Sequence, residues 1–416
     1  MEGSLFPLQN DAVVMGLLAL ILGFVFHTSG RTSGIWPRFY GVVPALLLCY
    51  FLPSLLNTFG LVDPEESQLY FVASRYLLPG SLVLLTLSID LKAFLKLGPK
   101  AVIMFLTGTT GIVIGGPIAI LVMSAAAPDV VGGVGPDAVW RGMATVAGSW
   151  IGGGANQTAM YEVFQPSNGL FTTMIAVDVI VANIWMAYLL YGAGRSKKFD
   201  ARFKADASAI DDVKKRVEDY QLSIARMPKL GDLMTILAIA FGATGLAHFG
   251  SDLLAPWLGE RFPELDKFSL TSGFFWLVVL ATTFGLVLSF TRARNYEGAG
   301  ASRVGSAFLY VLVATIGMKM DVTDILDQPG LFAVGFIWMA VHAALLIAVA
   351  YLIKAPFFFL AVGSQANVGG AASAPIVASA FHPALASVGV LLAVVGYALG
   401  TYAGWLCGIL MEMASG

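Results

Sequence analysis

Two short polar stretches interrupt this strongly apolar chain and carry the side chains best suited to bind a small molecule. The first is GSWIGGGANQTAM at 148–160, and the second is GSQANVGGAASAP at 363–375. Their amides and hydroxyls donate and accept hydrogen bonds, and their glycines permit tight turns and close backbone approach. The residues that we predict to bind a solute are Ser149, Gly153, Gly154, Asn156, Gln157, Thr158, Ser364, Gln365, Asn367, Gly369, Gly370 and Ser373.

A few charged side chains lie within apolar stretches, where each is a candidate for function. Asp178, in MIAVDVIVANIW, would seek a proton or a cation, so we predict an ion-coupling site for H⁺ or Na⁺ that Asn183 shares. The alternative for Asp178 is a structural carboxylate that caps a broken helix or binds hairpin backbone. Arg75 is a possible contact for an anionic solute, but it could equally pair with an acid or extend to the membrane surface. Glu162 belongs either to ion coupling or to the outer surface.

The segments that position these residues are long and apolar. Of the 416 residues, 57% are hydrophobic and only 12% are charged, whereas about 25% are charged in an average soluble domain. A helix needs roughly 20 apolar residues to cross the hydrocarbon core, and such stretches begin near residues 12, 39, 69, 100, 170, 231, 269, 302, 331 and 384. We therefore predict an all-α integral membrane protein with about ten transmembrane helices.

The two polar stretches occupy corresponding places in two similar halves. In each half an Asp-containing motif, LSIDLKAFL at 87–95 or MKMDVTDIL at 318–326, precedes an apolar span and then the glycine motif. We expect an N-terminal repeat at 1–192, a C-terminal repeat at 231–416, and between them a cytoplasmic linker at 193–230 with an amphipathic helix at 209–226. The linker carries ten basic and six acidic residues.

The distribution of basic residues indicates how the glycine motifs sit in the membrane. If both motifs crossed it fully, the chain would have twelve crossings and would violate the positive-inside rule through its first half. If 138–165 and 355–381 are instead re-entrant hairpins, nineteen Lys and Arg residues fall inside and four outside. This favours ten spans, two re-entrant glycine-rich hairpins and two inverted repeats, the construction of many secondary transporters. Close packing of small residues is the alternative, but it explains the glycines without the amides.

Several classes of function find no support in the sequence. The four histidines are scattered without metal-ligand spacing, no phosphate-binding loop is present, and no catalytic constellation is legible, so we expect neither an enzyme nor a resident cofactor. The basic residues follow membrane topology, which argues against a nucleic-acid partner. Cys49 and Cys407 lie within predicted spans and are expected as free thiols. The first residues, MEGSLFPLQND, lack a basic n-region and a cleavage signal, so we expect them in the mature protein.

Both glycine motifs, together with VDVIVANIWMAYLL at 177–190, resemble the YjcL-like family of uncharacterised multi-pass membrane proteins over nearly the whole chain. More distantly, paired hairpins in inverted five-span repeats are similar to the bacterial citrate and glutamate sodium symporters. That resemblance implies a scaffold, a moving transport domain, an elevator mechanism and a homodimer. Neither hairpin tip contains the arginine that would clamp a di- or tricarboxylate.

We therefore expect a secondary active transporter of the bacterial cytoplasmic membrane. It would move a small polar or anionic metabolite, bound between the hairpin tips, in symport with Na⁺ or H⁺ through Asp178. Its other partners would be membrane lipids and a second copy of the chain. A passive channel, or a membrane-embedded sensor or enzyme, remains an alternative.

Overall fold

The computed structural model describes residues 7–40, 43, 45–64, 66–205, 227–268, 270–321, 328–382 and 385–416, and within them the chain is helical, without a β-strand. The helix predicted at 209–226 lies outside these residues, as do residues 322–326 of the second Asp motif. The first half contains α1 (Asp11–Ser29), α2 (Trp36–Tyr40), α3 (Ala45–Thr58), α4 (Leu69–Val72), a π-helical turn η1 (Ala73–Leu77), α5 (Leu78–Leu87), α6 (Leu91–Lys96), α7 (Pro99–Ala126), α8 (Pro128–Val131), η2 (Gly135–Asp137), α9 (Val139–Gly152), α10 (Gly154–Phe164) and α11 (Asn168–Ala193). After α12 (Ser196–Phe203) follow α14 (Leu230–Arg261), η3 (Pro263–Phe268), α15 (Gly273–Ser289), η4 (Arg292–Ala299), α16 (Ala301–Gly317), α17 (Gly330–Ile353), α18 (Phe357–Val368), α19 (Gly370–Phe381) and α20 (Ala386–Ser415).

A helix lies in each of the ten apolar stretches, but the helices differ in length. Seven of them in the described part of the chain are long and apolar enough to cross a membrane. The other three, α3, α15 and α16, have 14, 17 and 17 residues, which is shorter than the roughly 20 residues that a perpendicular span needs. The protein is thus an integral membrane protein whose described residues are helical, with seven candidate spans by this criterion, or up to eight if the bent pair α15 and η4 is one span.

Each glycine motif folds as two antiparallel helices joined at a break. In hairpin 1, formed by α9 and α10, the Trp140 and Phe164 rings lie 5.6 Å apart. Arg141, beside Trp140, donates from Nη1 to the Phe164 carbonyl at 2.5 Å. In hairpin 2, formed by α18 and α19, the Phe358 and Phe381 rings lie 5.2 Å apart. The first turn of one helix and the last turn of the other are therefore neighbours at the base of each hairpin, and the glycine-rich break is its tip.

The two hairpins enter the helix bundle from opposite ends of α17. At the start of α17, Gly330 lies against Val130 of α8, the short helix that packs on α9 of hairpin 1. At the other end, Tyr351 contacts the Phe203 ring of α12 at 6.5 Å, and Phe199 of α12 stacks on Phe357 at the base of hairpin 2, at 4.7 Å. Because the bases are separated by the length of α17, the tips point toward each other.

Helices that occupy corresponding places in the two halves pack antiparallel. Along α7 and α17, Lys100 bonds the Lys354 carbonyl at 2.8 Å, and Gly111 approaches the His342 backbone closely enough that an added Cβ would lie 3.1 Å from its Cα. On the other side of the molecule α5 and α16 pack together in the same way, with Gly80 against Phe308. Inverted copies would pack like this, and the repeat itself stays a prediction.

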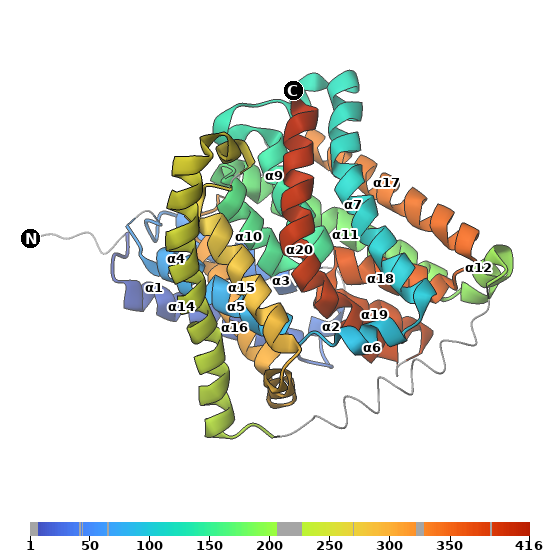
Figure 1. Cartoon of the computed structure of the whole chain (residues 1–416), viewed down its shortest axis with the longest axis horizontal. Coiled ribbons are helices and arrows are strands. Elements are labelled where there is room, and N and C mark those ends of the chain that lie inside the picture. Colours follow the sequence, from blue (N-terminus) through green and yellow to red (C-terminus); the bar gives the residue numbers. More distant parts are fainter. Residues whose placement is uncertain are drawn as a thin grey trace, which may run out of the picture.

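The helices form two groups. The hairpin bundle contains α7, α9–α11 and α17–α20, and the flanking bundle contains α1, α3, α4–α5 and α14–α16. Figure 1 shows α14, α15 and α16 on one side, α7, α17 and α18 on the other, and α20 between them. Helices within each group pack extensively, whereas α15 and α5 contact α10 and α20 over shorter lengths.

Glycines let α20 approach hairpin 1. Gly396, Gly400 and Gly404 recur every four residues and therefore share one face of α20. That face meets α9, where a Cβ added to Gly152 would lie 2.6 Å from the Gly396 carbonyl oxygen and 2.7 Å from the Gly400 Cα. Part of the small-residue pattern thus serves close packing, as the alternative interpretation proposed.

We predict that Gly152→Ala destabilises the protein by about 1–3 kcal/mol, because the new methyl group has no space beside α20. Gly16→Ala, at an exposed helical position with no atom within 4 Å of the added Cβ, should be neutral or stabilise by up to about 1 kcal/mol. The measurement is the apparent Tm of both purified variants in detergent. Equal Tm values would show that α9 and α20 are not in close contact.

Candidate functional site

The tips of the two hairpins meet at their glycine breaks. Hairpin 1 breaks at Gly153, with φ of 75°, and hairpin 2 breaks at Gly369–Gly370, where Gly370 has φ of 56°. Glycine adopts such positive φ values without the steric cost that a Cβ brings. A Cβ added to Gly370 would lie 3.7 Å from the Cα of Gly153, so the two breaks lie about one methyl group apart.

A cavity of about 130 Å³ lies at these breaks, and we call it the central cavity. Eight of the predicted site residues line it: Ser149, Gly153, Gly154, Asp178, Asn183, Gln365, Gly369 and Ser373. Sequence reasoning missed the apolar remainder of the lining, which is Leu46, Val179, Ala182, Met186 and Val368. Leu46 comes from α3, so the cavity opens on the boundary between the two bundles.

Asp178 is held in α11 by donors from hairpin 1. Its Oδ1 accepts from Trp150 Nε1 at 2.6 Å, and its Oδ2 accepts from Gln157 Nε2 at 2.9 Å. The Ser149 hydroxyl bonds the same carboxyl group. Because Asp178 is only 5% exposed, these bonds offset part of the cost of removing a carboxylate from water. These donors are hairpin side chains rather than the hairpin backbone of the structural alternative. They hold the carboxyl group beside a cavity that an ion could occupy, and its part in ion coupling stays a prediction.

Gln365 lines the central cavity and carries a buried acceptor without a partner among the described residues. Its Nε2 donates to Ser373 Oγ at 2.7 Å, whereas its Oε1 has no hydrogen-bond partner among the described residues. The side chain is 1% exposed. A buried acceptor without a partner costs about 1–3 kcal/mol, and a bound group with an N–H or O–H would remove that cost.

Asn156 and Asn367 do not line the central cavity. Each of them instead binds its hairpin to a neighbouring helix. Asn367 donates from Nδ2 to the Phe105 carbonyl of α7 at 3.0 Å and accepts from the Thr109 hydroxyl at 2.7 Å. Asn156 does the same against α20, donating to the Tyr397 carbonyl at 2.9 Å and accepting from the Thr401 hydroxyl at 2.7 Å. Both amides are fully buried and fully bonded.

The remaining predicted residues also lie outside the lining. Gln157 bonds Asp178, Thr158 donates to the Gly154 carbonyl at 2.9 Å, and Gly370 forms the break. Ser364 belongs to a chain of hydrogen bonds that connects four elements. Trp185 Nε1 donates to Ser364 Oγ at 2.8 Å, Ser364 bonds His342 Nε2 at 2.8 Å, and His342 Nδ1 lies 3.1 Å from the Gly108 carbonyl. That carbonyl only accepts, so Nδ1 carries the proton and Ser364 donates to Nε2.

Arg75 lies away from the central cavity and pairs with an acid, one of the alternatives considered for it. Its Nη1 is 3.5 Å from Oε2 of Glu162 in hairpin 1, so this ion pair bridges the two bundles. Arg75 sits in the π-helical turn just before Pro79. Proline cannot donate to the carbonyl four residues earlier, and His248 Nε2 of α14 bonds that Arg75 carbonyl instead, at 2.8 Å.

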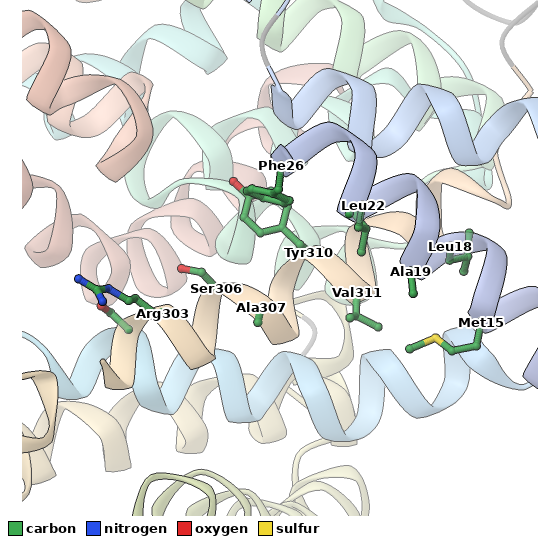
Figure 2. Close-up of a pocket in the computed structure, with 12 residues that line it drawn as sticks. Met15, Leu18, Ala19, Leu22, Phe26, Arg303, Ser306, Ala307, Tyr310 and Val311 are labelled. Carbon is green, nitrogen blue, oxygen red and sulfur yellow. The ribbon is translucent and has the colours of Figure 1, made fainter. Parts of the chain in front are cut away.

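A larger cavity elsewhere has the wrong chemistry for a polar solute. It has a volume of about 510 Å³, lies between α1 and α16, and is lined mainly by apolar side chains. Figure 2 shows Met15 at one end of this groove and Arg303 at the other. None of the predicted site residues lines it, so the smaller central cavity is the candidate solute site.

Comparison with known proteins identifies a family that matches nearly the whole chain. Residues 13–414 match the family described as "Protein of unknown function (DUF819)". The chain belongs to this family. It is also 22% identical, over 407 residues, to the uncharacterized membrane protein YjcL of Bacillus subtilis (strain 168), covering 94% of this chain and 96% of that protein. The resemblance to YjcL-like proteins is thus confirmed, and neither description names a substrate.

We predict that Asn367→Ala lowers the free energy of unfolding by about 1–3 kcal/mol, because it leaves the Phe105 carbonyl and the Thr109 hydroxyl buried without their partner. Ser373→Ala should cost less than about 1 kcal/mol, because water in the cavity can replace its bond to Gln365. Apparent Tm values of the purified variants measure both effects. A larger loss for Ser373→Ala would contradict the division into bracing and lining residues.

Proposed function

We propose that this protein is a secondary active transporter that binds a small polar or anionic metabolite between the tips of two re-entrant hairpins. The observation that carries the proposal is the contact of two glycine breaks, from hairpins with opposite orientation, beside a cavity with a buried carboxylate. Non-helical backbone is tolerated at membrane depth only where protein or a wet cavity surrounds it. Broken helices around a central site are typical of secondary transporters.

The proposed topology has ten spans, with α3, α15 and α16 as short crossings of the flanking bundle. The bases of the two hairpins lie at opposite ends of α17. Near the base of hairpin 2 lie Lys100, Lys354 and the basic residues of α12. By the positive-inside rule we assign this end to the cytoplasm. The proposal therefore has the linker in the cytoplasm, in a protein of the bacterial cytoplasmic membrane.

The solute would meet both donors and acceptors in the central cavity. The described side chains that line it include one charged group, the Asp178 carboxylate, and no lysine or arginine. Gln365 Oε1 would accept from an N–H or O–H of the solute. The N-terminal ends of α10 and α19 begin at the breaks without a side-chain cap, and their amide groups would receive an anionic group.

The coupling ion, Na⁺ or H⁺, would bind at Asp178. Ser149, Asn183 and Gln365 line the same cavity, and their side chains carry oxygen atoms of the kind that suits a hard cation. For transport we propose an elevator motion, in which the hairpin bundle slides past the flanking bundle. The short contacts of α5 and α15 with α10 and α20 support it, and a homodimer held by the flanking bundles would supply a fixed frame.

The first prediction from this proposal concerns the orientation of the hairpins. Single cysteines replacing Asn168 or His382, in a background without the buried Cys49 and Cys407, should react with a membrane-impermeant maleimide from opposite faces of the membrane. These positions lie at the base of hairpin 1 and hairpin 2 respectively. Reaction of both from one face would exclude the re-entrant architecture.

The second prediction concerns ion coupling. If Na⁺ is the coupling ion, the apparent Tm of the purified protein should be higher in Na⁺ than in choline at the same concentration. At a hundred times its Kd, Na⁺ should stabilise the folded protein by about 2.7 kcal/mol. Asp178→Asn should remain folded and lose the shift, whereas the exposed control Asp252→Asn should keep it. An undiminished shift in Asp178→Asn would remove this residue from the mechanism.

If Na⁺ gives no shift in the wild type, H⁺ is the proposed coupling ion. The measurement is then a pH-gradient-driven current in vesicles, recorded during perfusion with a panel of amino acids and small carboxylates. Asp178→Asn should abolish that current.

A further inference from the structure

A second, larger groove runs along the outside of α11 and α17. It consists of a cavity of about 830 Å³ and a neighbouring one of about 250 Å³, which share Trp185 and Tyr188 as lining residues. We call the two together the α11–α17 groove. Neither part contains a lining residue of the central cavity, so this groove is a separate feature on the other side of α11.

The smaller part of the α11–α17 groove is apolar. Besides Trp185 and Tyr188 it is lined by Val181, Ile184, Phe336, Met339, Ala340 and Ala343. Ile184 and Phe336 are 41% and 43% exposed although both belong to helices long enough to span the membrane. In a membrane such an exposed apolar surface would face hydrocarbon, and its cavity of about 250 Å³ offers room for part of an acyl chain.

The larger part ends under α12, a short amphipathic helix at the end of α11. Phe199 and Phe203 point to the protein, where Phe199 stacks on Phe357 at 4.7 Å. Asp200 is also turned inward, since its Oδ1 accepts from the Phe357 backbone N–H at 2.7 Å. The apolar face and the acid of α12 are thus used in packing.

The outward face of this segment is strongly basic. Five exposed cations lie within ten residues: Arg195, Lys197, Lys198, Arg202 and Lys204. Asp200 is the one acid in the same stretch. Arg202 lines the groove itself, and the Arg195 guanidinium lies 3.9 Å above the ring of Tyr191, another lining residue. Tyr188, Tyr191 and Tyr351 are each at least 60% exposed, as aromatic residues at a membrane–water interface commonly are.

We propose that the α11–α17 groove binds an anionic phospholipid. Its phosphate meets Arg202 and the neighbouring cations of α12, and an acyl chain lies in the apolar part against Ile184 and Phe336. The argument is charge complementarity next to a hydrocarbon-facing channel, because a basic cluster directly beside a membrane helix attracts anionic headgroups. The α1–α16 groove has Arg303 as the one cation among its described lining residues, so it lacks this cluster.

The test is native mass spectrometry of the full chain with phosphatidylglycerol and with phosphatidylcholine of identical acyl chains. We expect phosphatidylglycerol to bind at least fivefold more tightly. Arg202→Gln should weaken it about fivefold, and Arg195→Gln with Arg202→Gln more than tenfold, at about 1 kcal/mol for each cation near a membrane surface. Equal binding of the two lipids, or unchanged binding by the double variant, would overturn the proposal.

Two matched variants separate the headgroup site from the acyl-chain site and from other grooves. Ala340→Phe, at an exposed lining position, should fill the apolar channel and weaken both lipids. Arg303→Gln should leave phosphatidylglycerol binding unchanged, and an equal loss there would show that general surface charge is responsible. Excess inorganic phosphate should displace no lipid, and displacement would instead indicate a site for a free anion.

Discussion

The whole arrangement depends on one constraint, which is that backbone amides and carbonyls left unpaired at a helix break must not face lipid. Each such group costs several kcal/mol in hydrocarbon. The chain contains two breaks in apolar segments, at Gly153 and at Gly369–Gly370, and it shields both by bringing them together. The hairpin bundle exists around this contact, with α20 behind hairpin 1 and α7 behind hairpin 2. The central cavity follows, because two turns that touch cannot fill all the space beside them.

Polar residues around the breaks divide into two groups with different tasks. Asn156 and Asn367 fasten the hairpins to neighbouring helices, and both amide groups donate two hydrogen bonds and accept one within the protein. Gln365 and Ser373 line the cavity, and Oε1 of Gln365 is a buried acceptor without a partner among the described residues. A protein that binds a polar solute in a membrane needs both groups, since a mobile tip could not hold a defined geometry.

Much of this was predictable from local sequence. The glycine triplet at 152–154 and the pair at 369–370 indicated breaks, the amides beside them indicated a polar tip, and the carboxylate of Asp178 indicated a buried ionisable site. The helix that each amide side chain contacts was not predictable, because Asn156 and Gln157 are adjacent and yet bond different helices. Nor was the role of Trp150, which lies inside the first motif and bonds Asp178 across 28 residues. The short lengths of α3, α15 and α16 likewise depend on tertiary packing rather than on hydropathy.

The chain from Trp185 through Ser364 and His342 to Gly108 has a fixed direction, since the indole at one end only donates and the carbonyl at the other only accepts. It therefore stays neutral along its length and crosses α11, α18, α17 and α7 without leaving a charge inside. This one chain of hydrogen bonds consequently links all four helices. Moving any one of these four helices relative to the others would break a hydrogen bond of this chain, which favours their staying together as one unit.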